Sequence, residues 1–163
     1  VVCIDISGSM NAALADNSSR SGWAKAVAFA LWSVANKERR NFYCIEFDSA
    51  VGASYKTTKD NLMQLLTVKA NGGTSFEAPL REAQRIINSE KAFKKADIIF
   101  ITDGCSTIYP EYKENLNEWK RKTNTSIFSI QLSNGTDNST LKDFSDEIIT
   151  YDGSDNFTRV FKL

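Results

Sequence analysis

Short apolar runs alternate along the chain with longer segments in which apolar residues recur at helical spacing. The runs are rich in β-branched and aromatic residues, a composition that is typical of strands. They occupy residues 1–4, 42–47, 97–101, 126–132 and 147–151. Three of the runs are almost continuously apolar, as is expected of parallel strands that are covered on both faces.

The segments between the runs predict helices. The longest lies at 22–40, where the expected apolar side is formed by Ala26, Phe29, Ala30, Leu31 and Val34. A second lies at 75–89 and carries Leu80, Ala83, Ile86 and Ile87 at helical spacing. Further helices are expected at 59–66, 110–123, 139–146 and 154–161, and polar connections at 11–21 and 131–139.

This alternation of strands and helices predicts an α/β fold with a mostly parallel sheet and helices on both faces. A short segment at 51–55 adds an antiparallel edge strand. The expected sheet is therefore six-stranded and doubly wound, with the Rossmann-like order 3-2-1-4-5-6. The length favours one domain, 1–163. The chain begins within an expected strand and without an initiator methionine, which favours a domain excised from a longer protein.

The charge balance argues against two classes of partner. Twenty basic and twenty acidic residues cancel, whereas a nucleic-acid-binding domain normally carries a basic excess. The same balance gives no reason to expect attraction to a membrane, and no apolar run approaches the ~20 residues that a transmembrane helix needs. The chain contains no histidine, which excludes histidine-based acid–base catalysis and His-ligated zinc.

The cysteines indicate the redox environment. Cys3, Cys44 and Cys105 form an odd set without CxxC spacing, which fits neither a disulfide framework nor a zinc site. Reduced thiols in a cytoplasmic protein are the favoured interpretation. Because Cys105 lies two residues after an aspartate, it is also a candidate for a reactive thiol.

Small oxygen-bearing residues follow the ends of two expected strands. "DISGS" places Asp5, Ser7 and Ser9 directly after the first strand, and "ITDG" places Asp103 after the strand at 97–101. "NGGTS" brings Thr74 to the start of the helix at 75–89. In the expected strand order, the first and fourth strands are neighbours at the point where ligands bind in open α/β sheets. The two aspartates are therefore expected to meet there, with Thr74 approaching from a third loop.

A ring of carboxylate and hydroxyl oxygens suits a hard divalent cation. Mg²⁺ is the expected ion, and Mn²⁺ or Ca²⁺ would also suit a site made of oxygens. Because most of these groups are neutral, the ion would be incompletely neutralised and would attract one more carboxylate from outside. Each piece also has a simpler explanation, since Ser7, Ser9 and Thr74 could be turn or cap residues and Asp103 could belong to a plain turn.

The motifs "DISGS", "GGTS" and "TDG" resemble the metal ion-dependent adhesion site (MIDAS) of von Willebrand factor A domains. All five positions match in order, and the expected strand and helix order extends the resemblance over the whole chain. The resemblance implies that Ser7, Ser9 and Thr74 ligate the metal, and that Asp5 and Asp103 often act through water. It also implies that an Asp or Glu of a protein partner completes the coordination.

Within this family, the layout looks most like intracellular microbial members of the CoxE-like type. These act as adaptors beside MoxR-type AAA+ ATPases, so such an ATPase is the partner that the resemblance implies. An extracellular adhesion domain is the alternative, although such domains often carry a disulfide that joins their ends, and only Cys3 lies near an end here. In some members the last helix shifts when a partner carboxylate binds; here that would be 154–161 or its neighbour.

Two other functions stay open. An aspartate at the end of a first strand could be a phosphoryl-transfer nucleophile, as in haloacid dehalogenase-type phosphatases. That chemistry needs a second acid two residues on, where this chain has Ser7, and the chain carries no P-loop. The sequence therefore predicts a protein that is not an enzyme. The remaining alternative is a scaffold whose metal is structural and always bound.

Overall fold

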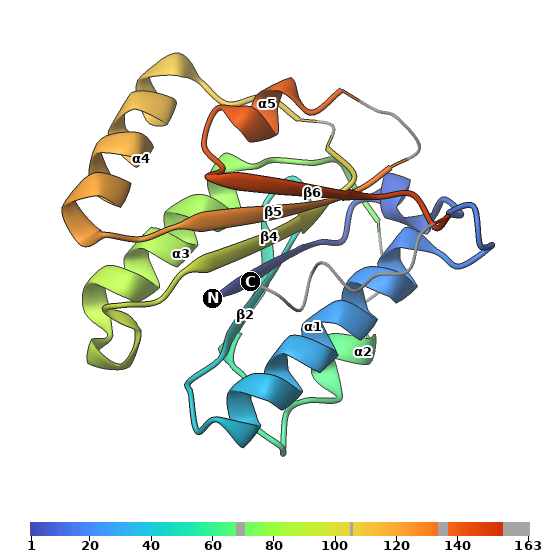
Figure 1. The fold of residues 1–163 in the computed structure, drawn as a ribbon, viewed down its shortest axis with the longest axis horizontal. Coiled ribbons are helices and arrows are strands. Elements are labelled where there is room, and N and C mark those ends of the chain that lie inside the picture. The colour runs from blue at the N-terminus through green and yellow to red at the C-terminus, as the bar shows by residue number, and fades with distance from the viewer. Residues whose placement is uncertain (68–70, 105, 134–136, 155–163) are drawn as a thin grey trace.

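The centre of the protein is a six-stranded sheet with the order β3-β2-β1-β4-β5-β6 (Figure 1). The computed structural model describes residues 1–67, 71–104, 106–133 and 137–154. All neighbouring strands are parallel except β2 and β3. The predicted fold class and strand order are confirmed. The strands are β1 (Val2–Asp5), β2 (Tyr43–Phe47), β3 (Val51–Lys56), β4 (Ile98–Thr102), β5 (Ile127–Leu132) and β6 (Glu147–Tyr151).

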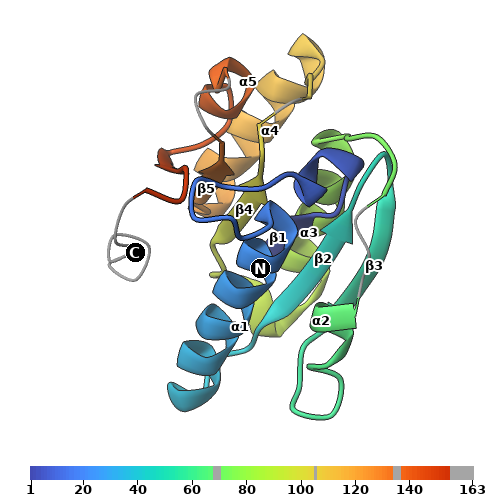
Figure 2. The same cartoon turned by 90° about the vertical axis from the view of Figure 1, so that its right-hand side faces the viewer.

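Helices cover both faces of the sheet, as Figure 2 shows from the side. One face packs on α1 (Arg20–Lys37) and α2 (Gln64–Thr67). The other packs on α3 (Glu77–Ser89), α4 (Pro110–Thr123) and α5 (Ser139–Lys142). Two 3-10 helices, η1 (Gly8–Asn11) and η2 (Lys91–Phe93), complete the described elements. None of the helices in the described part of the chain has the length and apolarity needed to cross a bilayer.

The apolar side predicted for the longest helix is wrong at three of its five residues. Ala26, Phe29 and Val34 are exposed, whereas the sheet is covered by Ala24, Val27, Ala28 and Trp32. Apolar residues occur on most sides of α1, so their spacing alone did not select the buried side. The small side chains of Ala24 and Ala28 let the helix approach the sheet closely, and this packing decides the orientation.

Several predicted boundaries also shift. The helix expected at 22–40 begins earlier, at Arg20, because the Ser19 hydroxyl caps it by accepting from N of Gly22 at 3.0 Å. The helix expected at 75–89 begins at Glu77, and its predicted apolar positions are all buried. Only the end of the segment 59–66 is helical, and 139–146 is helical only to Lys142. Apart from Ser154, the helix expected at 154–161 lies outside the described residues, as does Cys105.

An aromatic cluster supports the ends of the central strands. The ring of Phe100 in β4 lies 5.1 Å from Phe47, 5.2 Å from Phe76 and 5.4 Å from Phe144, measured between centroids. Most of these pairs are edge-to-face, an arrangement that aromatic quadrupoles favour. Phe47 ends β2 and Phe76 precedes α3. The cluster therefore fixes the loop that follows Phe47 and the loop that leads to Phe76.

The two described cysteines lie in the interior of the sheet. Cys3 and Cys44 are fully buried and carry free thiols. Burial raises the pKa of the Cys3 thiol to about 12, and burial likewise raises the pKa of Cys44. Both thiols therefore stay protonated and unreactive at neutral pH.

Candidate functional site

Three chain segments meet at the carboxyl edge of the sheet. N of Gly8 donates to O of Gly72 at 3.0 Å, which joins the loop after β1 to the loop before α3. The hydroxyl of Ser106 donates to O of Thr74 at 3.1 Å, which joins the latter loop to the segment after β4. The segments that carry the five predicted residues are therefore in direct contact.

Asp5 is the last residue of β1, and its carboxylate is fully buried. Its Oδ1 accepts from N of Ser7 at 2.8 Å, and its Oδ2 accepts from the hydroxyl of Thr102 at 2.6 Å. Burial raises the pKa of the Asp5 carboxyl and the nearby charge of Asp103 raises it further, while the hydrogen bonds from Ser7 and Thr102 act in the opposite direction. The carboxylate thus links the ends of β1 and β4.

The two serines place their hydroxyls beside each other, with Oγ atoms 3.1 Å apart. Ser7 is buried and Ser9 is exposed, so the pair leads from the interior to the surface. Ser7 precedes η1, but its side chain makes no capping hydrogen bond to that helix. Helix capping therefore does not explain the Ser7 hydroxyl.

Thr74 is half-buried in the loop before α3. The N-cap residue of α3 is Phe76, so Thr74 does not cap this helix. The loop needs glycine at position 72, where φ is +83° and an added Cβ would lie 2.8 Å from a carboxylate oxygen of Asp48. This backbone conformation turns the segment of Thr74 toward the loop after β1.

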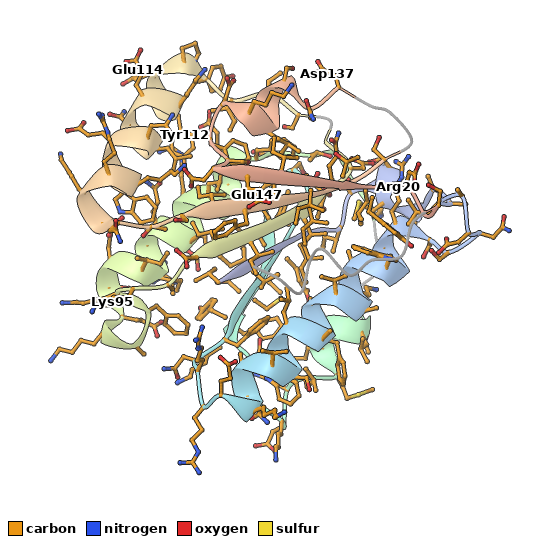
Figure 3. The ribbon with its side chains drawn as sticks, in the orientation of Figure 1. Arg20, Lys95, Tyr112, Glu114, Asp137 and Glu147 are labelled. Atoms are coloured by element: carbon orange, nitrogen blue, oxygen red, sulfur yellow. The ribbon has the colours of Figure 1, made fainter. Side chains whose placement is uncertain are left out.

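Asp103 directly follows β4 and is almost completely buried. Its Oδ2 lies 3.0 Å from Nη1 of Arg20, the first residue of α1, and the Arg20 side chain is only 15% exposed. Figure 3 shows Arg20 at the edge of the sheet toward which the strand arrows of β5 and β6 point. A basic side chain therefore contacts Asp103 at this edge.

Sequence reasoning did not identify Arg20, Thr102 or Ser106 as part of this region. Arg20 is the only basic residue in the polar segment 11–21, which is a usable signal. Thr102 interrupts the apolar run of β4 directly before Asp103, and its hydroxyl also accepts from N of Gly104 at 3.2 Å. A polar residue at the end of a buried strand next to an aspartate is a second usable signal.

The residues at this edge differ from a metal site made of carboxylates, cysteines and histidines. Within the described ranges, no group of three or more His, Cys, Asp or Glu side chains gathers in a way that could hold a metal ion. The candidate set instead has two carboxylates and three hydroxyls. Carboxylate and hydroxyl oxygens are hard ligands, so the donor set fits a divalent cation such as Mg²⁺.

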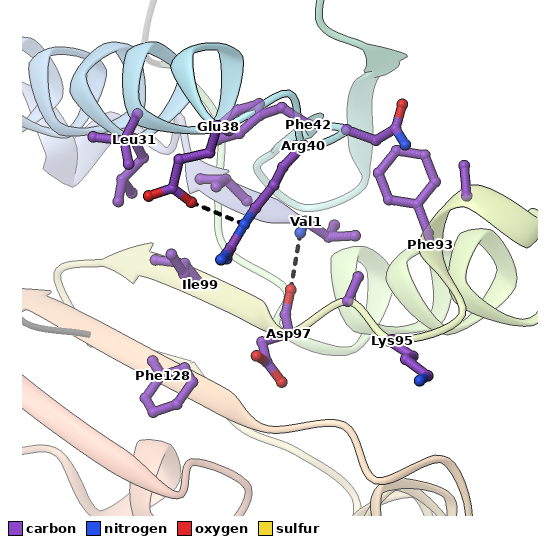
Figure 4. A pocket seen from close by; sticks show the side chains of 16 residues that line it. Val1, Leu31, Glu38, Arg40, Phe42, Phe93, Lys95, Asp97, Ile99 and Phe128 are labelled. Carbon is purple, nitrogen blue, oxygen red and sulfur yellow. Dashed lines mark hydrogen bonds and ion pairs between the residues drawn. The ribbon is translucent and has the colours of Figure 1, made fainter.

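A separate cavity of about 590 Å³ lies at the opposite, amino edge of the sheet (Figure 4). Leu31 and Val34 of α1 line one side of the cavity, and Phe42, Ile99 and Phe128 line the side formed by the strands. Glu38 and Arg40 form an exposed ion pair of 2.9 Å at its rim. The cavity is mostly apolar and is not part of the candidate metal site.

Comparison with known proteins agrees with the fold. A family model described as von Willebrand factor type A domain matches residues 1–106, a range that contains all five candidate residues. The chain belongs to the von Willebrand factor type A domain family. The strand order described above is thus that of a von Willebrand A domain.

One curated relative, the Uncharacterized protein MJ0811 of Methanocaldococcus jannaschii, is 33% identical over 165 residues. The match covers 98% of this chain and 36% of the relative, so the chain spans about a third of that protein's length.

Two solved structures share the fold at low sequence identity. The pilus adhesin SpaC of Lactobacillus rhamnosus GG has a TM-score of 0.72 and 14% identity, covering 93% of this chain and 28% of the adhesin. Proximal thread matrix protein 1 of the mussel byssus, described with a zinc-occupied MIDAS motif, has a TM-score of 0.71 and 15% identity. That match covers 99% of this chain and 43% of the mussel protein. At these identities, the likeness shows the fold alone.

Proposed function

We propose that this domain is a non-catalytic protein-binding module that depends on a divalent metal ion. Asp5, Ser7, Ser9, Thr74 and Asp103 would hold Mg²⁺, with Mn²⁺ or Ca²⁺ as substitutes. The observation that carries the proposal is the meeting of two buried carboxylates with hydroxyl-bearing loops at the carboxyl edge of the sheet. Two buried like charges are costly together, and a cation beside them relieves that cost.

The bound ion would supply an open coordination position for an Asp or Glu carboxylate of a protein partner. Family membership supports this reading, because all five residues lie within the matched range. The zinc-occupied MIDAS motif of the mussel protein also supports it, since that protein shares this fold. The partner that the sequence resemblance favours is a MoxR-type AAA+ ATPase in the cytoplasm, for which this domain would be an adaptor.

Catalysis is not part of the proposal. Phosphoryl transfer from an aspartate at the end of β1 would need a second acid two residues later as general acid–base. That position is Ser7, whose hydroxyl lies against Ser9. Detection of Mg²⁺-dependent phosphatase turnover that disappears in Asp5→Asn would overturn this part of the proposal.

Calorimetric titration with Mn²⁺ and Mg²⁺ tests the metal site. The wild-type domain is expected to bind either ion at one site, and Asp5→Ala is expected to abolish binding while circular dichroism still shows a folded protein. Glu114→Ala is the matched control, since Glu114 is an exposed acid on α4, far from Arg20 in Figure 3. Equal binding by wild type and Asp5→Ala would overturn the site.

Pull-down from the source cell's lysate then tests the partner. A partner retained by wild type in Mg²⁺, but lost both in EDTA and with Asp5→Ala, is the expected result. Retention in all three conditions would mean that recognition uses another surface and that the metal, if bound, is structural.

A further inference from the structure

Arg20 is a positively charged side chain that reaches the proposed metal site, and backbone contacts hold it there. N of Arg20 donates to O of Ala12 at 3.0 Å, and Ala13 and Ser19 form a β-bridge across the intervening loop. Ser19 also caps α1 by accepting from N of Gly22. The position of Arg20 at the start of α1 is therefore fixed by the loop that precedes it.

This loop is anchored a second time, against the segment that follows β6. N of Ala15 donates to O of Asp152 at 2.8 Å. Gly153 has φ of +93°, and a Cβ there would lie 2.8 Å from N of Ala15, so the two segments are in close contact. A loop held at both ends fixes the backbone of Arg20 beside Asp103.

The pairing of Arg20 with Asp103 involves one guanidinium nitrogen, Nη1. Nε of Arg20 is buried and has no hydrogen-bond partner among the described residues. Two-point contacts between arginine and a carboxylate are stronger and more specific than this arrangement. The pair can therefore rearrange at lower cost when another cation approaches Asp103.

The charges at the site determine what Arg20 does to a divalent ion. Asp5 and Asp103 carry two negative charges and Arg20 offsets one of them, so a divalent ion leaves the site with a net positive charge. Asp48 also lies at this edge, but it is half-buried and its Oδ1 accepts from N of Ala50. Solvent screens such a rim charge more strongly than the buried pair.

Building on the proposed function, we infer that Arg20 couples metal binding to binding of the partner's carboxylate. Arg20 weakens the hold of the site on a metal ion alone, because it offsets Asp103 and repels the ion. It strengthens the attraction of the loaded site for an anion, because the remaining charge is positive. Metal and acidic partner thus bind tightly only together, and each raises the affinity for the other by the same factor.

Calorimetric titration of Mn²⁺ tests this coupling, with acetate as the carboxylate probe and chloride at equal ionic strength as its reference. In chloride, Arg20→Gln is expected to bind Mn²⁺ about tenfold more tightly than wild type, as removal of a nearby unit charge implies at protein-surface screening. Acetate is expected to tighten Mn²⁺ binding in wild type and to have a smaller effect in Arg20→Gln. Arg20→Lys, which keeps the charge, is expected to resemble wild type.

Arg121→Gln is the matched control, because it removes the same charge from an exposed position in the last turn of α4. It is expected to leave both the Mn²⁺ affinity and the acetate effect unchanged. Unchanged or weaker Mn²⁺ binding by folded Arg20→Gln would overturn the inference. Weaker binding would mean that Arg20 positions Asp103 for the metal. Failure of the proposed function would look different. Wild type would then show no Mn²⁺ binding, or only binding that Asp5→Ala does not remove.

Discussion

The two edges of the sheet bury different groups. At the carboxyl edge, Asp5, Thr102 and Asp103 are polar and almost completely buried, and the cation Arg20 joins them. At the amino edge, the cavity is lined by apolar side chains such as Phe42. The charged side chains at the rim of that cavity are exposed.

The difference shows where burial lowers the stability of the fold without being required for folding. Buried carboxylates destabilise a protein unless charges and hydrogen bonds compensate them, whereas an apolar cavity needs no such compensation. Asp5 accepts two such compensating hydrogen bonds, from N of Ser7 and from the hydroxyl of Thr102. This cost makes the carboxyl edge the better candidate for a site under functional constraint.

The largest expected effect is common to both edges, because both depend on the same sheet. Phe100→Ala removes the centre of the aromatic cluster and is expected to destabilise the domain by about 3–5 kcal/mol. Phe29→Ala is the control, since Phe29 is 41% exposed, and it should cost less than about 1 kcal/mol. Urea unfolding measures both. A small loss for Phe100→Ala would mean that the cluster does not support the strand ends.

A smaller effect should distinguish the carboxyl edge. Thr102→Val keeps the shape of the side chain but leaves Oδ2 of Asp5 without the hydroxyl donor and N of Gly104 without its acceptor. The expected destabilisation is about 1–3 kcal/mol in urea unfolding. Thr67→Val, which removes an exposed hydroxyl bonded to O of Gln64, should stay within about 0.5 kcal/mol. Equal effects would contradict a special cost at this edge.

The charge of Asp5 should oppose folding when no metal is present. Burial is the main reason why the pKa of Asp5 is raised in the folded protein. The stabilising contribution of the protonated carboxyl is therefore complete below the pKa of the unfolded state. It is lost as the pH rises through the pKa of the folded state. In EDTA at neutral pH, Asp5→Asn is therefore expected to melt a few degrees above wild type.

Two conditions sharpen this expectation. The difference should disappear below about pH 4, where the unfolded carboxyl is also protonated. In saturating Mg²⁺ the order should reverse, because only wild type gains stability from the bound ion. Thermal melts of both proteins at each condition measure this. A lower melting temperature of Asp5→Asn in EDTA at neutral pH would show that hydrogen bonding outweighs the burial of the charge.

The sequence was sufficient for the features that follow from strand order. Asp5 and Asp103 each follow or end an apolar run, and parallel strands that are neighbours must bring such residues to one edge. Likewise, the spacing of Leu80, Ala83 and Ile86 selects one side of α3, because its other sides are polar.

Features that depend on packing between distant segments were not predictable. Apolar residues occur on most sides of α1, and only contact with the sheet decides which side is buried. The approach of Arg20 to Asp103 depends on the path of the loop from Ala12 to Ser19 and on its contact with Asp152. Such a path has no periodic signal, so the pairing required the three-dimensional structure.

The smallest expected effect concerns the amino edge. Glu38 and Arg40 form an ion pair of 2.9 Å whose side chains are 48% and 75% exposed, so solvent should screen most of their attraction. A double-mutant cycle with Glu38→Gln and Arg40→Gln, measured by urea unfolding, should give a coupling energy below about 0.5 kcal/mol. A coupling above about 1.5 kcal/mol would exceed the range of exposed pairs. The amino edge would then also bear charges that solvent does not screen, and the contrast with the carboxyl edge would no longer single out one functional site.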